Sequence, residues 1–278
     1  MSELSLYLPW RPAALPDAQR LAAWAHLAGW SCRIELVQTL PNQGGPALAL
    51  GEFTNSAQWI GPQRWQLPAS DWAALSIWAE AHLPAVAKPW TCFTDGLPGK
   101  EAVLPGEYWV AAGQAGAVAL DFAPPEWALL RRWRHEKRRL ALAESCTGGG
   151  LAARLTALPG SSALLQHGIV SYSNTAKMAL LHVREETIAR VGAVAEATAL
   201  EMLEGALREA DLAAAITGIA GPGGAVPGKP VGTVCIAWGQ RGAAGQVRTC
   251  HFTGDRWTVQ YAAGSVALGG LLGLLCSS

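Results

Sequence analysis

Apolar and polar residues alternate after residue 135 in a way that predicts strands and helices in turn. The predicted strands are short apolar or β-rich runs at 140–143, 168–173, 212–217, 232–238 and 246–252. The predicted helices, from apolar positions at helical spacing, are 151–158, 174–181, 196–210 and 255–275. The last two strands are expected to form a hairpin, because a Gly-rich stretch separates them. This order predicts an α/β fold, with a layered mixed sheet and flanking helices.

The first half of the chain follows another pattern, in which Pro and Gly interrupt short apolar segments. The apolar segments are 4–8, 31–40, 47–53 and 108–120, and the helix-like stretches are 16–29 and 70–82. Eleven of the 13 tryptophans precede residue 135. The change in composition predicts two domains: a smaller, Trp- and Pro-rich α+β domain over 1–135, whose function the sequence does not reveal, and an α/β domain over 136–278.

Charge gives no general reason to expect a polyanionic partner. Lys and Arg number 21, and so do Asp and Glu. Positive charge is concentrated at 131–139, with the sequence RRWRHEKRR, just before the first predicted strand of the second half. This run is interpreted as a solvated helix face or linker, with a nucleic-acid patch as the alternative.

The cysteines and the terminal segments give no sign of metal binding, secretion or membrane association. The six cysteines form no CxxC pair, and no Cys/His set has zinc spacing, so we expect neither a metal nor another cofactor. The N-terminus lacks the basic and apolar regions of a signal peptide. The apolar tail 266–276 is too short and Gly-rich to be expected to span a bilayer. We therefore expect a cytoplasmic protein with no membrane partner.

The segment 143–150, with the sequence AESCTGGG, contains the most informative chemistry. Between a predicted strand and a predicted helix it presents hydroxyls on Ser145 and Thr147, a thiol on Cys146 and three glycines. A helix N-terminus with free N–H groups attracts anions and stabilises developing negative charge. The alternative is an ordinary turn in which Ser145 or Thr147 caps the helix.

Further motifs follow in the order of the chain. The first is Gly160-Ser161-Ser162, and the second is the segment 168–177, with the sequence GIVSYSNTAK. A Gly-rich loop at 217–224, with the sequence TGIAGPGG, is followed by 229–234, and Gly254-Asp255-Arg256 stands near the C-terminus. In this order and spacing the motifs resemble the C-terminal domain of the CinA family, the nicotinamide mononucleotide (NMN) amidohydrolases. The resemblance covers residues 140–275.

The resemblance implies roles for particular residues. It places a serine nucleophile at Ser162, a lysine base at Lys177, and an assisting tyrosine and serine at Tyr172 and Ser145. The residues expected to contact substrate are Thr147, Gly148, Gly149, Asn174, Thr217, Gly218, Gly221 and Arg256. The glycine loops would supply N–H groups to an oxyanion or a phosphate, and Arg256 would pair with the phosphate.

The residues leave alternatives open at three of these positions. Lys177 acts as a base only if burial or a neighbouring cation lowers its pKa, and a solvated helix lysine is the alternative. Cys146, beside a predicted helix N-terminus, is a rival nucleophile or a packing residue. Tyr172 donates to or relays protons with Lys177, or is a half-buried aromatic.

The resemblance implies metal-free hydrolysis of the NMN carboxamide to nicotinate mononucleotide and ammonia. NMN is then the small-molecule partner, and a homo-oligomer, a dimer, is expected. The competing hypothesis is an inactive nucleotide-sensing or interaction protein linked to competence or DNA damage. Ala195 keeps it open, since relatives usually have serine there; the change removes an N-cap worth about 1 kcal/mol.

Overall fold

A computed structural model of the protein describes residues 124–133 and 137–276 continuously. The other described residues are 3–8, 18, 21–22, 25, 30–36, 40, 47–50, 64–67, 75, 78–79, 81–82, 90–92, 100–101 and 108–110. The chain divides into two compact units. The first comprises Met1–Pro89 and Asp121–Pro124, and the second comprises Trp90–Leu120 and Pro125–Ser278.

The first unit contains a four-stranded sheet in the order β2-β1-β3-β4, whose neighbouring strands pair in parallel. Its strands are β1 (Glu3–Leu8), β2 (Ser31–Leu36), β3 (Ala47–Leu50) and β4 (Arg64–Leu67). Ala18, Leu21, Leu75 and Ala79 are helical and fully buried, as their spacing predicts. The remaining residues of the predicted segments 16–29, 31–40, 47–53, 70–82 and 108–120 lie outside the described residues.

The second unit carries every candidate motif and is built on a five-stranded sheet in the order β12-β11-β10-β8-β9. The strands are β8 (Leu140–Glu144), β9 (Leu165–Val170), β10 (Leu212–Gly218), β11 (Thr233–Gln240) and β12 (Gln246–His251). Strands β9, β8 and β10 run parallel, while β11 is antiparallel to both of its neighbours. The carboxyl ends of β9, β8 and β10 therefore meet at one edge of the sheet, where α/β folds place their sites. A smaller antiparallel sheet joins β5 (Trp90–Cys92), β7 (Tyr108–Val110) and β6 (Lys100–Glu101).

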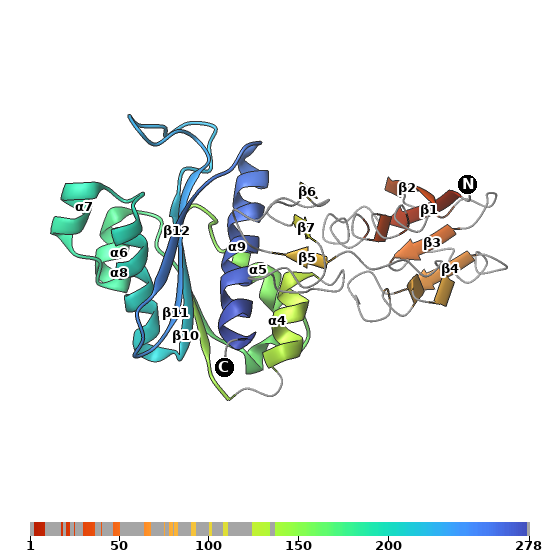
Figure 1. Ribbon diagram of the computed structural model, residues 1–278, viewed down its shortest axis with the longest axis horizontal. Helices are drawn as coiled ribbons and strands as arrows, with labels where there is room; N and C mark the ends of the chain where they lie inside the picture. The colour runs from red at the N-terminus through yellow and green to blue at the C-terminus, as the bar shows by residue number, and fades with distance from the viewer. Residues whose placement is uncertain are drawn as a thin grey trace. The chain divides into compact units, whose positions relative to one another are not determined.

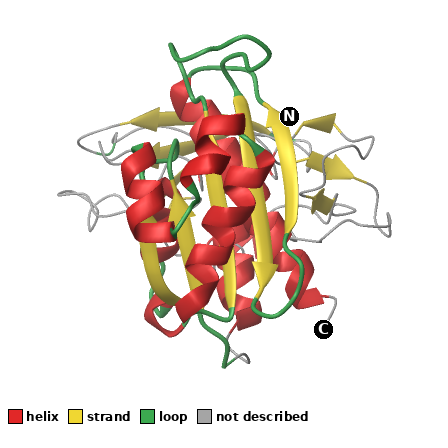
Figure 2. Ribbon diagram, turned by 90° about the vertical axis from the view of Figure 1, so that its left-hand side faces the viewer, coloured by secondary structure: helices red, strands yellow, loops and turns green. Residues whose placement is uncertain are grey.

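Helices cover both faces of the five-stranded sheet, so the predicted layered α/β fold is confirmed (Figures 1 and 2). One face carries α8 (Glu196–Ala206), with α6 (Asn174–Leu181) and α7 (Glu185–Val191) packed beside it. The other carries α9 (Arg256–Cys276), with α4 (Pro125–Trp133) and α5 (Gly150–Thr156) beside it. Where the structure describes this unit, it also contains two 3-10 turns, Ser161–Ala163 and Leu207–Glu209.

Small side chains on the strands let α8 pack closely on its face of the sheet. The buried cluster there joins alanines of β8 and β10 to Met202 and Leu203 of α8. Gly205 serves the contact between α8 and α6, because a Cβ at this position would lie 2.1 Å from the Leu181 carbonyl oxygen. This close approach holds α6 against α8.

Helices α4 and α7 were not predicted from the sequence. The basic run 131–139 begins in α4, whose Ala128, Leu129 and Trp133 are buried, so α4 belongs to the second unit. Beyond α4, Arg139 donates its N–H to Asp211 (2.8 Å) and a guanidinium N–H to the Leu165 carbonyl (3.0 Å). Arg139 is therefore part of the fold, whereas Arg131 is exposed on α4, and the continuous part of the second unit begins at Pro125.

Helix α9 is longer than the apolar tail considered above. Over Arg256–Leu275 it is long and apolar enough, by length and composition, to cross a membrane. However, 67% of its apolar window is buried inside the protein, where it packs against β10, β11 and α4. Such burial is typical of a core helix.

Candidate functional site

Lys177 is the centre of the candidate site. It lies on α6, one turn after Ser173, whose hydroxyl caps the helix by accepting from the Ala176 N–H (3.0 Å). Only 1% of Lys177 is exposed. Its Nζ donates to Ser145 Oγ (2.9 Å) and to the Ser171 carbonyl oxygen (2.8 Å). Burial lowers the pKa of the Lys177 amine, which answers the open question of whether this lysine is solvated.

Ser145 is held at the carboxyl end of β8. Its N–H donates to the Ile216 carbonyl of β10 (3.0 Å), which continues the ladder one residue beyond the strand. Ser145 is buried, and its hydroxyl meets the buried amine. A hydroxyl beside an amine of lowered pKa is the arrangement that nucleophilic catalysis requires. The structure therefore joins Ser145 to Lys177, two residues 32 positions apart.

Strand register adds further hydroxyls in line with Ser145. One residue beyond the pairs Glu144↔Val170 and Ile216↔Glu144, Ser171 and Thr217 flank Ser145 on the two neighbouring strands. Side chains alternate along a strand, so all three continue the face that α8 covers. Thr217 is already engaged, because its hydroxyl donates to the Ala193 carbonyl (2.9 Å). Ser171 was not predicted as a site residue from the sequence.

Glu144 binds the N–H groups at the start of α5. Its carboxylate is 1% exposed and accepts from the N–H groups of Gly149 (3.0 Å), Leu151 (3.1 Å) and Ala152 (2.8 Å). The N–H groups of Gly148 and Gly150 are taken by the Ser145 and Thr147 carbonyls. The first turn of α5 thus holds an anion of the protein itself, and these N–H groups are not free for an oxyanion or a phosphate. A glutamate ending an apolar strand directly before a helix start was the signal that could have revealed this.

The glycines of the second loop serve the packing of the chain. A Cβ at Gly218 would lie 2.8 Å from the Thr233 carbonyl oxygen and the Val234 Cα. Gly221 has φ 88° and offers its carbonyl to a guanidinium N–H of Arg256 (2.7 Å). These contacts explain the glycines by close approach of neighbouring strands and by a left-handed turn.

Arg256 and Tyr172 form a second group at the same edge of the sheet. The Arg256 guanidinium donates to the Tyr172 hydroxyl (2.9 Å), and Asp255 accepts from the Thr258 N–H (2.8 Å) to cap α9. Arg256 is exposed, and Tyr172 is 62% exposed. Tyr172 therefore contacts Arg256 where we expected it to contact Lys177. Asn174 is exposed at the start of α6, between the two groups in sequence.

Ser162 lies apart from Lys177 along the fold of this chain. It is exposed on the 3-10 turn that precedes β9, and the Leu164 carbonyl, two residues later, accepts from Leu140 at the start of β8. Ser145 follows the other end of β8, so it lies about 16 Å from Leu140, at 3.3 Å per strand residue. Because β8 and β9 are parallel, Ser162 lies at the opposite edge of the sheet from Lys177. Within one chain Lys177 does not reach Ser162.

The two residues after Ser145 differ in the chemistry that they can perform: Cys146 carries a thiol and Thr147 a hydroxyl. Burial raises the pKa of the Cys146 thiol to about 12, so this thiol stays protonated and is a poor nucleophile. Thr147 is 5% exposed, and its Oγ1 has no partner among the described residues. A buried hydroxyl without a partner is costly, which makes Thr147 a candidate donor to a ligand.

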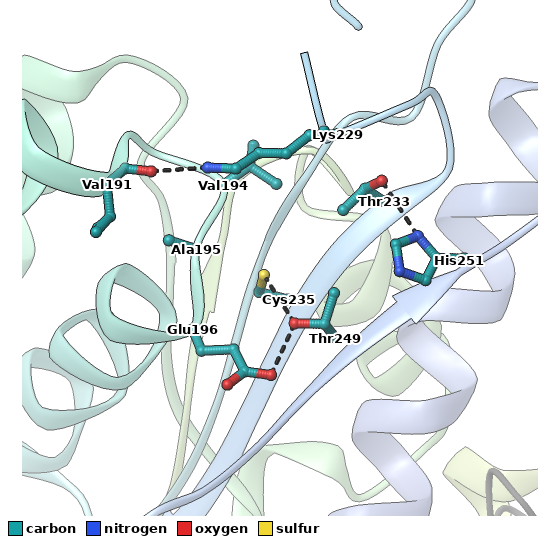
Figure 3. A pocket seen from close by; sticks show the side chains of 10 residues that line it. Val191, Val194, Ala195, Glu196, Lys229, Thr233, Cys235, Thr249 and His251 are labelled. Carbon is teal, nitrogen blue, oxygen red and sulfur yellow. Dashed lines mark hydrogen bonds between the residues drawn. The ribbon is translucent and has the colours of Figure 1, made fainter. Parts of the chain in front are cut away.

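A pocket of about 510 Å³ lies further along the same edge of the sheet, between β11, β12 and the loop before α8. Figure 3 shows that the Thr249 hydroxyl donates to the Glu196 carboxylate and is also hydrogen-bonded to the Cys235 thiol. Lys229 Nζ donates to the Val191 carbonyl. Ala195 is the N-cap of α8 and provides no side-chain hydrogen bond, as expected for this residue. The Thr217–Ala193 hydrogen bond joins β10 to this same loop.

Comparison with known proteins places the second unit in a family. The family model described as the CinA C-terminal domain matches residues 125–275. A CinA-like protein of Mycolicibacterium vanbaalenii is 50% identical over 133 residues, which are 47% of this chain and 32% of the relative. A CinA-like protein of Akkermansia muciniphila is 41% identical over 172 residues, 61% of this chain and 40% of the relative. The chain thus spans about a third to two fifths of these relatives' lengths.

Solved structures agree with this placement. The competence damage-inducible protein A of Klebsiella pneumoniae is 41% identical, with a TM-score of 0.53 over 55% of this chain and 95% of that one. A CinA superfamily protein of Escherichia coli is 37% identical, with a TM-score of 0.52 over 59% of this chain and 94% of that one. The match at 125–275 includes α4, in agreement with its packing on α9. Through its second unit, this chain belongs to the CinA C-terminal domain family.

Proposed function

We propose that this protein is an amidohydrolase that converts NMN to nicotinate mononucleotide and ammonia. The observation that carries the proposal is the buried contact between Lys177 Nζ and Ser145 Oγ (2.9 Å). A serine hydroxyl becomes a good nucleophile when a neutral amine takes its proton, and burial favours the neutral amine. This geometry supports Ser145 as the nucleophile, in place of Ser162.

The mechanism proceeds through an acyl-enzyme. Ser145 Oγ forms a bond to the carboxamide carbon while Lys177 takes the hydroxyl proton. The tetrahedral intermediate then collapses: the C–N bond breaks, and the Lys177 ammonium returns its proton to the departing nitrogen as ammonia. A water molecule, deprotonated by the same amine, then attacks the ester carbon. The C–Oγ bond breaks, the Lys177 ammonium returns its proton to Ser145 Oγ, and nicotinate mononucleotide leaves.

Substrate binding relies on local donors, because the chain carries no net charge. Arg256 is the cation best placed for the phosphate: it lies at the same edge of the sheet as Ser145, and its guanidinium retains N–H groups beyond the two given to Gly221 and Tyr172. Because Tyr172 and Gly221 anchor it, little freedom is lost when phosphate binds. Thr147 and Asn174 complete the set of donors proposed around the nucleotide.

The test uses the full chain and NMN, with ammonia release and nicotinate mononucleotide formation as the readouts. Wild type is expected to turn over, and Ser145→Ala and Lys177→Met are expected to be inactive while unfolding as cooperatively as wild type. Glu204→Gln, an exposed change on α8, is the control. Chelator should leave the rate unchanged. Absence of ammonia from the folded wild type, or full activity in Ser145→Ala, would overturn the proposal.

A further inference from the structure

Ser171 is a buried residue whose side chain has no partner among the described residues. It follows the last residue of β9 and is fully buried. Its N–H donates to the Glu144 carbonyl (2.8 Å), and its own carbonyl accepts from Lys177 Nζ (2.8 Å). Its Oγ makes no hydrogen bond. Leaving a buried hydroxyl unpaired is costly, so such a group in a native site calls for a ligand or another functional reason.

The position of Ser171 follows from strand register. Ser171 stands one residue beyond the pair Glu144↔Val170, and therefore opposite Ser145 on the neighbouring strand. Neighbouring strands lie about 4.8 Å apart. Two residues earlier on each strand, Ala143 belongs to the buried cluster under α8 and Ile169 packs against it, so Ser145 and Ser171 lie on that same face. The unpartnered hydroxyl is thus beside the Ser145–Lys177 pair.

The reaction at Ser145 needs a hydrogen-bond donor that the glycine loop does not supply. Attack on an amide places negative charge on the carbonyl oxygen, which must be stabilised by fixed donors. The N–H groups of the glycines and of the first turn of α5, residues 148 to 152, are occupied by Glu144 and by turn carbonyls. A buried hydroxyl with an unused proton, fixed by its own main-chain hydrogen bonds, can take their place.

We propose that the Ser171 hydroxyl donates to the carbonyl oxygen of the amide that Ser145 attacks, and stabilises the negative charge that forms there. This proposal rests on the proposed function insofar as Ser145 is the nucleophile. It assigns to Ser171 a direct contact with the substrate, in addition to the main-chain contact by which it holds Lys177.

Kinetics of Ser171→Ala in the full chain provide the first test. Removing one oxyanion donor typically lowers kcat about 10²-fold or more, and little change in KM is expected because the charge forms only in the transition state. The variant should unfold at the wild-type temperature or above it, since it removes an unpaired hydroxyl. Unchanged kcat would overturn the proposal.

Ser265→Ala is the matched control. Ser265 is equally buried on α9, but its hydroxyl accepts from the Arg154 guanidinium (3.2 Å), and it is not part of the proposed site. This variant is expected to lower thermal stability and to keep kcat. The two serines should therefore show opposite effects on activity and stability.

A thioamide substrate separates a direct contact from a structural role. Sulfur is a poorer hydrogen-bond acceptor than oxygen, so wild type should turn over the thionicotinamide analogue of NMN far more slowly than NMN. Without the donor, Ser171→Ala should discriminate much less between the two. A variant slower than wild type that keeps the full wild-type ratio would overturn the proposal, because a structural defect slows both substrates alike.

A fluorophosphonate probe tests Ser171 even if NMN is not a substrate. The Ser145 Oγ–P bond forms, the P–F bond breaks, fluoride leaves and Lys177 takes the proton; labelling is followed by mass spectrometry. Ser171→Ala should label more slowly than wild type, because the phosphoryl oxygen loses its donor. Equal rates would overturn the Ser171 proposal alone. A wild type that hydrolyses no NMN but shows this slowing would overturn only the substrate. Absence of label at Ser145 in wild type would overturn both.

Discussion

Replacing Glu144 by Gln should destabilise the second unit, because its buried carboxylate accepts three N–H groups from the start of α5. One carboxylate oxygen serves Gly149 and Leu151, and the other serves Ala152. In Gln an amide oxygen can keep the first two contacts, but its NH₂ then faces the Ala152 N–H. The variant thus loses one charge-assisted hydrogen bond and weakens two, a cost of about 2–3 kcal/mol.

This cost should be visible in thermal unfolding. For a unit of this size each kcal/mol lowers Tm by about 2–4 °C, so Glu144→Gln is expected to unfold about 4–12 °C below wild type. Calorimetry of the full chain measures the shift. Glu204→Gln, the same change at an exposed site on α8, should leave Tm near wild type. Equal Tm values for the two variants would refute the assignment of Glu144 as the anion that organises the Ser145 loop.

Four further predictions follow. Because burial lowers the pKa of Lys177, the amine should lose its proton at pH values below those usual for lysine, and kcat should rise with pH in that range. In the same pH range the unfolded chain holds a proton that the folded chain lacks, so the stability of wild type relative to Lys177→Met should also rise with pH. A flat kcat profile would contradict this assignment. Ser162→Ala should keep wild-type ammonia release, and a loss as large as that of Ser145→Ala would require Ser162 of a second copy at the site. Arg256→Ala should raise KM for NMN about tenfold or more and change kcat far less, because it removes an ion pair with the phosphate worth about 1.5–3 kcal/mol. Nicotinamide riboside lacks the phosphate, so an equal loss of activity on the riboside would exclude phosphate recognition by Arg256. A fragment of residues 125–278 should be soluble and fold, whereas a fragment of residues 140–278 should lose stability or solubility because it lacks the buried face of α4. Equal thermal unfolding of the two fragments would show that α4 does not stabilise the fold.

Periodicity predicted the elements that are buried along one face or one stripe. Strands β8 and β10–β12 and helices α6, α8 and α9 lie within a few residues of the predicted segments, and Ser173 caps α6 as its residue type suggests. Helix α4 was missed because its arginines resemble a charged linker, while its apolar face is recognisable only against α9. Helix α7, only seven residues long, carries too few periodic positions to stand out.

The pairing of the candidate catalytic groups could not be predicted, because it depends on the direction and register of strands. Ser162 and Lys177 are close in sequence, but β9 runs between them and carries them to opposite edges of the sheet. Ser145 is more distant in sequence, yet β8 ends beside β9 and brings it to the lysine. Residue types and spacing indicated the kind of chemistry, while the order of strands selects which serine the lysine meets.

Strand alternation also explains how a carboxylate and a lysine of lowered pKa coexist so close together. Glu144 and Ser145 are consecutive, so their side chains leave β8 on opposite faces: Glu144 reaches the start of α5, and Ser145 reaches Lys177. The N–H groups of α5, rather than Lys177, are the hydrogen-bond partners of the carboxylate. Burial therefore remains the main influence on the pKa of Lys177 and lowers it. Were the carboxylate one position later, it would face the amine and form a buried ion pair, which raises the lysine pKa and leaves no base for a serine. The order Glu-Ser at the end of β8 is thus what allows one strand to anchor a helix with one side chain and to present a nucleophile with the next.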